Sequence, residues 1–99
     1  MADYRAADVD YLEMRVGEVL TLDSLRQAVV PPYVMIVPFI ELPPIMELVR
    51  QDNLEEEGVH GCTFTLRATA VGEGTMRVGF RDLREGKVAL AKQIQAKVG

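Results

Sequence analysis

The residues in this 99-residue sequence that are best suited to chemistry are His60 and Cys62, its only histidine and its only cysteine. A cysteine beside a histidine can act as a nucleophile when a third group orients the histidine. Cys62, however, opens an apolar alternation, which predicts a buried and unreactive thiol. His60 lies between Gly58 and Gly61 in a predicted loop. It is there either a solvated side chain or a contact for a partner protein.

The other candidate motifs do not support catalysis. One cysteine and one histidine are too few for a zinc site. The carboxylates show no pairing at a recognisable spacing. Gly72 and Gly74 join two predicted strands, so no helix follows them to bind a phosphate. The sequence therefore predicts a protein that is not an enzyme and that has no cofactor.

Composition excludes several further classes. The net charge of −4 and the scattered lysines and arginines argue against nucleic acid as a partner. No apolar run approaches the roughly 20 residues that span a bilayer. The first 14 residues lack the features of a secretory signal, which predicts a cytoplasmic protein. About half of the residues are apolar, so residues 1–99 are expected to form one packed domain.

The clearest structural signal is an alternation of apolar and polar residues over 58–82. It has the period of two that a strand with one buried face requires. Residues 62–70 and 76–80 are therefore predicted to be two strands, with Phe64 and Phe80 in the core and Arg67 and Arg77 facing solvent. The break at Gly72–Gly74 predicts that these strands pair as a β-hairpin.

Shorter alternations surround this region. Residues 12–16 and 19–22 predict strands, and residues 1–10 are expected to be a flexible segment. Residues 87–98 alternate as a strand, although helix formers make a helix over 87–97 the competing interpretation. Lys92 falls in the apolar phase of this strand, which predicts a bulge, an edge position or a break. About seven short strands separated by turns are typical of an all-β, immunoglobulin-like antiparallel sandwich.

Residues 29–49 are unusual because they contain all five prolines and almost no charge. Proline is confined to strand starts, edges and bulges, so the prolines are expected to divide the run into short extended pieces at 33–37, 39–42 and 45–49. These pieces are either core strands or an exposed apolar edge that meets a partner. The edge interpretation predicts that at least two of six apolar side chains are exposed in the monomer, or buried only against another chain: Val34, Ile36, Phe39, Ile40, Ile45 and Met46.

The order of these features resembles the chagasin-type inhibitors of papain-like cysteine proteases. The resemblance is carried by Gly17–Leu22, by Gly58–Gly61, and by a central run that contains Phe64, Ala68, Gly72, Met76, Val78, Phe80 and Arg81. It covers roughly 60 residues, most of them at sandwich-forming positions. The family's N-P-T-T-G-Y loop is replaced here by Val30-Pro31-Pro32-Tyr33, and its R-P-W loop by Arg81-Asp82-Leu83.

The resemblance implies an immunoglobulin-like sandwich whose loops at one end enter the cleft of a papain-like cysteine protease. The partner-binding residues that it implies are Pro31, Pro32, Tyr33, Val59, His60, Arg81, Asp82 and Leu83. Tyr33, His60 and Arg81 are then expected at the same end of the sandwich. The alternative is an assembly subunit that oligomerises, or docks on a partner, through residues 29–49.

Overall fold

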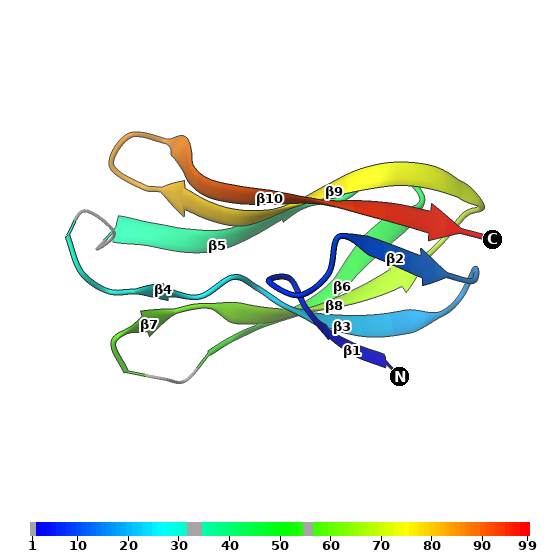
Figure 1. The fold of residues 1–99 in the computed structure, drawn as a ribbon, viewed down its shortest axis with the longest axis horizontal. Helices are drawn as coiled ribbons and strands as arrows, with labels where there is room; N and C mark the ends of the chain where they lie inside the picture. The colour runs from blue at the N-terminus through cyan, green and yellow to red at the C-terminus, as the bar shows by residue number, and fades with distance from the viewer. Residues whose placement is uncertain (1, 32–34, 55–56) are drawn as a thin grey trace.

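The computed structural model describes residues 2–31, 35–54 and 57–99, which form two packed sheets (Figure 1). The first sheet has the order β1-β3-β8-β6 and the second has the order β2-β10-β9-β5. A small ladder joins β4 to β7. The strands of the first sheet are β1 (Ala2–Arg5), β3 (Val19–Asp23), β8 (Cys62–Ala68) and β6 (Met46–Asn53). Those of the second are β2 (Tyr11–Met14), β10 (Lys87–Val98), β9 (Gly72–Asp82) and β5 (Ile36–Glu41), and the ladder strands are β4 (Gln27–Ala28) and β7 (Val59–His60).

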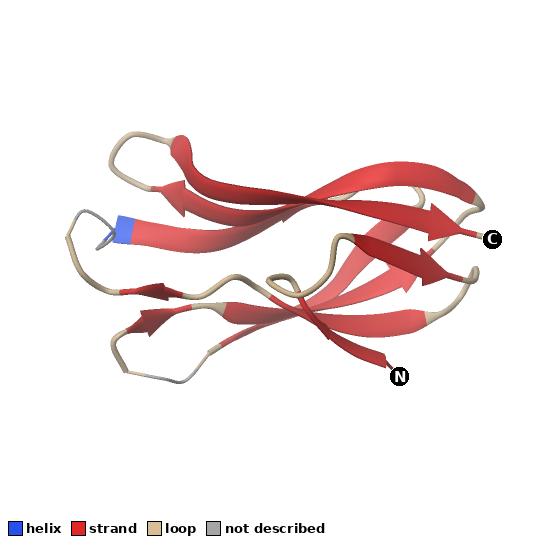
Figure 2. Ribbon diagram, viewed as in Figure 1, coloured by secondary structure: helices blue, strands red, loops and turns tan. Residues whose placement is uncertain are grey.

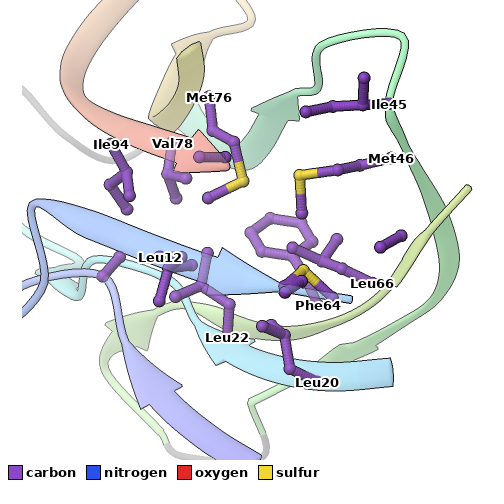
Figure 3. Packing of buried hydrophobic residues seen from close by; sticks show 14 of the residues in the cluster. Leu12, Leu20, Leu22, Ile45, Met46, Phe64, Leu66, Met76, Val78 and Ile94 are labelled. Carbon is purple, nitrogen blue, oxygen red and sulfur yellow. The ribbon is translucent and has the colours of Figure 1, made fainter. Parts of the chain in front are cut away.

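The core lies between the sheets, and the predicted alternation builds it. Phe64 and Leu66 of β8 and Met76 and Val78 of β9 are fully buried. Figure 3 shows side chains of the two sheets meeting in the space between them. Phe80 is also fully buried, while Arg67 is exposed. The predicted fold class, an all-β immunoglobulin-like sandwich, is confirmed, and strands dominate Figure 2.

The predicted hairpin between residues 62–70 and 76–80 is wrong. β8 belongs to the first sheet and β9 to the second, so Thr69–Val71 is a crossing between sheets. The crossing is held by Ile45, whose carbonyl oxygen accepts hydrogen bonds from the backbone nitrogens of Thr69 (2.8 Å) and Ala70 (3.4 Å). The buried faces of β8 and β9 therefore oppose each other across the core. The alternation predicted which residues are buried, but it did not predict which strands pair.

Gly74 serves packing in this region instead of a turn. A Cβ atom at this position would lie 2.4 Å from Cβ of Pro43 and 2.9 Å from its Cγ. Only glycine allows the start of β9 to approach the proline ring this closely. The actual hairpin joins β9 to β10, and Gly86, with φ of 66°, provides the positive φ in its turn.

Residues 2–5 form strand β1, within the segment 1–10 that was expected to be flexible. β1 pairs in parallel with β3, and the Thr21 hydroxyl donates a hydrogen bond to the Asp3 carboxylate. The Ala6 side chain is fully buried, and its backbone nitrogen donates to the carbonyl oxygen of Asp23 at 2.8 Å. The polar sequence of residues 2–5 did not predict β1, because a four-residue edge strand needs few apolar side chains.

The proline-rich run supplies two edge strands, β5 and β6. Pro38 lies within β5 and does not divide it, because an edge strand leaves one row of backbone groups without a sheet partner and therefore tolerates a missing N–H. Of the six side chains expected to include exposed ones, Ile36, Ile45 and Met46 are buried, and Phe39 and Ile40 are half-buried. The sixth, Val34, lies outside the described residues. The prediction of at least two exposed members is therefore wrong, although the edge position is correct.

Residues 87–98 form a strand over their whole length, so the competing helix is excluded. The bulge in this strand falls between Val88 and Leu90 and not at Lys92. The edge position also expected for Lys92 is correct, because β2 pairs with β10 only over Gln95–Val98. The side chain of Lys92 lies on the same face of β10 as the buried Ile94. This is possible because its ammonium group contacts the Ala7 carbonyl oxygen (3.2 Å) and the Asp10 carboxylate (3.3 Å). In the part of the chain that the structure describes, no helix is long and apolar enough to cross a membrane.

Candidate functional site

Three connections meet at one end of the sandwich. Their described residues are 29–31 and 35 between β4 and β5, 54, 57 and 58 between β6 and β7, and 83–86 between β9 and β10. Figure 1 shows these described parts at the end of the sandwich away from the C-terminus, with those of the β4–β5 connection between the other two. We call this end the loop pole. Loops at one pole of two packed sheets come together although they are far apart in sequence.

Two backbone hydrogen bonds tie these connections together. The nitrogen of Val29 donates to the carbonyl oxygen of Gly58 at 2.9 Å, and the nitrogen of Leu83 donates to the carbonyl oxygen of Met35 at 2.8 Å. The central connection is thus joined at its start to one neighbour and at its end to the other. Because backbone groups make both bonds, the arrangement does not depend on side-chain identity at these four positions.

The β9–β10 turn is stiffened further by Asp82. Its carboxylate accepts a hydrogen bond from the backbone nitrogen of Arg84 at 2.9 Å, and its carbonyl oxygen accepts one from the nitrogen of Gly86 at 2.8 Å. The guanidinium of Arg84 lies 3.7 Å from the same carboxylate. Asp82 therefore shapes the turn and is half-buried, while Leu83 beside it is 55% exposed.

The loop pole exposes four large apolar side chains beside charged ones. The apolar side chains are Val29, Val30, Met35 and Leu83, and the exposed charged residues are Glu57, Arg84 and Glu85. Only Leu83 was among the residues predicted from the sequence. Val29, Val30 and Met35 belong to the uncharged run around Pro31 and Pro32. That run predicted an apolar segment, but it did not predict which of its side chains face solvent.

Some of the remaining predicted site residues belong to the connection between β4 and β5, and the others belong to strands β7 and β9. Pro31 is exposed at the loop pole, whereas Pro32 and Tyr33 lie outside the described residues. Val59 and His60 are not loop residues as expected but form β7, where they pair with β4 and are half-buried. Arg81 is exposed near the end of β9, with Cζ 5.7 Å from the centroid of the Phe39 ring. β7 follows one connection of the loop pole, and β9 precedes another. The position of Tyr33 stays a prediction.

Cys62 cannot supply a nucleophile in this arrangement. It is buried, and its backbone nitrogen donates to the Ser24 hydroxyl oxygen at 2.9 Å. Burial raises the pKa of the Cys62 thiol to about 11, against the opposing effect of hydrogen bonds from Ser24 and Gln51. The thiol is therefore almost entirely protonated at neutral pH. Among the described residues, no group of three or more histidine, cysteine, aspartate or glutamate side chains is placed to hold a metal ion.

This burial predicts slow alkylation of Cys62. At pH 7.5 the folded protein is expected to resist iodoacetamide under conditions that fully label a small free thiol, since both access and thiolate are lacking. In denaturing urea, labelling should go to completion, as measured by intact mass. Equal labelling rates in the folded and unfolded protein would contradict the buried position.

Comparison with known proteins identifies the fold. No protein-family profile matches the sequence, and no curated protein does. Among solved structures, the crystal structure of the cysteine protease inhibitor EhICP2 from Entamoeba histolytica superposes with a TM-score of 0.73 at 12% identity, over 99% of this chain and 97% of that one. The solution structure of amebosin superposes with a TM-score of 0.66 at 11% identity, over 99% of this chain and 95% of that one. The fold-level resemblance to chagasin-type inhibitors is thereby confirmed.

Proposed function

We propose that this protein is a non-catalytic inhibitor of papain-like cysteine proteases that inserts its loop pole into the protease cleft. The observation that carries the proposal is the linking of three connections at one end of the sandwich, by the bonds from Val29 to Gly58 and from Leu83 to Met35, with apolar side chains exposed beside these bonds. The fold that it shares with a cysteine protease inhibitor over nearly the whole chain supports the same assignment.

The geometry suits this role because an inhibitor gains affinity from surfaces that are ordered before binding. Ordering a loop at the moment of association costs binding free energy, and rigid protease–inhibitor complexes avoid that cost. At the loop pole, Asp82 fixes one turn and two interloop bonds fix the spacing of the connections. The exposed side chains of Val30, Met35 and Leu83 then supply the apolar contact area.

We infer that the differences from the chagasin-type loops change the chemistry of the contact. Val30-Pro31-Pro32 stands where the family has a threonine–glycine segment. Proline fixes its own φ and restricts the preceding residue, so this sequence predicts less backbone freedom than a glycine would allow. Leu83 follows Arg81 and Asp82 in place of an aromatic residue. We infer that the apolar leucine occupies the position of the aromatic contact.

The test is titration against a panel of papain-like proteases with a fluorogenic substrate. The wild-type protein is expected to reduce the initial rate in a saturable manner. Leu83→Asp should weaken inhibition at least tenfold, because a carboxylate must be desolvated in an apolar contact. Val71→Asp is the matched control, since Val71 is 71% exposed in the β8–β9 crossing at the other end of the sandwich. Absence of inhibition at micromolar protein across several proteases would remove the proposal.

A second candidate is an assembly subunit, which is favoured by Leu48 and Val49. These neighbouring side chains of edge strand β6 are 42% and 47% exposed and come from the proline-rich run. Sedimentation velocity separates the candidates, because a loop-inserting inhibitor is expected to be monomeric alone whereas an assembly subunit associates. Association that Val49→Lys abolishes would favour the second candidate.

A further inference from the structure

The outer face of the second sheet changes character along its length. Three-strand rows cross β5, β9 and β10, and the two outward-facing rows nearest the loop pole are Val37–Arg81–Val88 and Phe39–Gly79–Ala91. We call the side chains of these rows, Val37, Phe39, Arg81, Val88 and Ala91, the outer strip. Val37 is 37% exposed and Val88 is 39% exposed. The solvent face of an antiparallel sheet is normally polar, so this half is exceptional.

The other half of the same face is polar and internally paired. In the next row the guanidinium of Arg77 lies 3.0 Å from the Glu41 carboxylate. Beyond it, the Thr75 hydroxyl donates to the Gln95 side-chain oxygen at 3.1 Å. The outer strip is therefore not a general property of the sheet but is confined to the end that carries the loop pole.

Arg81 is the charge of the outer strip and has no carboxylate partner among the described residues. Its guanidinium lies over the Phe39 ring at 5.7 Å from the centroid, and its backbone lies in register between Val37 and Val88. Stacking of this kind holds the cation in place while its N–H donors stay available. An arginine fixed on an aromatic ring among apolar side chains is typical of residues that dominate protein–protein binding energy.

The outer strip is continuous with the loop pole. Val37 lies two residues after Met35 and Arg81 lies two residues before Leu83, and Met35 and Leu83 are joined by the interloop hydrogen bond. A partner that receives the loop pole in a cleft has a wall beside that cleft. On this side of the molecule, such a wall would lie over Val37, Arg81 and Val88.

We propose that the outer strip is a second contact surface for the same protease, occupied by a wall of the cleft that presents a carboxylate surrounded by apolar side chains. The carboxylate accepts hydrogen bonds from Arg81, and the apolar surroundings cover Val37 and Val88. This inference rests on the proposed inhibitory function. Arg81 is already among the partner-binding residues that the resemblance implies; the inference adds contacts at Val37 and Val88 on the sheet face and assigns Arg81 a carboxylate partner.

The experiment measures inhibition constants of strip variants against a papain-like protease that the wild-type protein inhibits. Arg81→Gln and the double variant Val37→Thr with Val88→Thr are each expected to weaken inhibition about tenfold. Threonine keeps the β-branched shape of valine, so the strands are preserved. Arg77→Gln and Val71→Thr are matched controls outside the outer strip and should stay within about twofold of wild type. Melting temperatures confirm that every variant is folded.

The outcomes separate the two proposals. Loss of inhibition in the strip variants and not in the controls supports the outer strip, and the effect of Arg81→Gln should shrink as salt concentration rises. If the strip variants inhibit like wild type while Leu83→Asp does not, the outer strip is overturned and the loop pole stands. If the wild-type protein inhibits no papain-like protease, the inference falls together with the proposed function.

Discussion

Replacing Phe64 with alanine is expected to lower the free energy of unfolding by about 3–5 kcal/mol. The ring is fully buried at the centre of β8, with strands of the same sheet on both sides and the second sheet opposite. Its removal leaves a cavity that packed sheets cannot close by a local adjustment. For a domain of this size, we expect the melting temperature to fall by more than about 10 °C, measured by circular dichroism.

Arg67→Ala is the matched control on the same strand. Arg67 faces solvent, and its guanidinium lies 3.1 Å from the Glu47 carboxylate with both side chains about half exposed. Exposed pairs contribute little, so the cost should stay below about 1 kcal/mol. Equal losses from the two substitutions would show that the alternation of β8 has been assigned to the wrong faces.

Gly74→Ala should destabilise the protein by about 1–3 kcal/mol although it adds only one methyl group. The new Cβ would lie 2.4 Å from Cβ of Pro43, an atom fixed to the backbone by its ring. β9 or the residue 42–44 connection must therefore move to accommodate it. Denaturant unfolding would show a lower midpoint with an unchanged slope.

A double-mutant cycle tests the origin of this effect. Pro43→Gly removes the atoms that the new methyl group meets, so the additional cost of Gly74→Ala should largely disappear in that background. If the cost of Gly74→Ala is the same with and without the proline ring, the close approach is not its cause.

The sequence was most informative about burial. The alternation at Phe64, Leu66, Met76 and Val78 predicted their faces correctly because a period of two reflects one strand at a time. Strand pairing depends on residues distant in sequence, which is why the Gly72–Gly74 break was misinterpreted as a hairpin turn. The sequence alone does not show whether a glycine is needed for close packing, as Gly74 is against Pro43, or for a turn.

The candidate site was predictable only in outline. An immunoglobulin-like sandwich places alternate connections at one pole, so the general position of Pro31 and Leu83 follows from the fold. The bonds between Val29 and Gly58 and between Leu83 and Met35 leave no trace in the sequence, because backbone groups make them. The stacking of Arg81 on Phe39 could not be predicted either, because it depends on how β5 and β9 are aligned in the sheet.

The parallel pairing of β2 with β10 has a consequence for how the protein is made. Tyr11–Met14 lie beside Gln95–Val98, so β2 cannot complete its pairing until β10 has been synthesised. The core residues Leu12 and Met14 stay uncovered by their final neighbours until Ile94, Ala96 and Val98 have left the ribosome. The second sheet therefore closes through a pairing between segments that are far apart in the sequence, which is the kind of contact that slows folding.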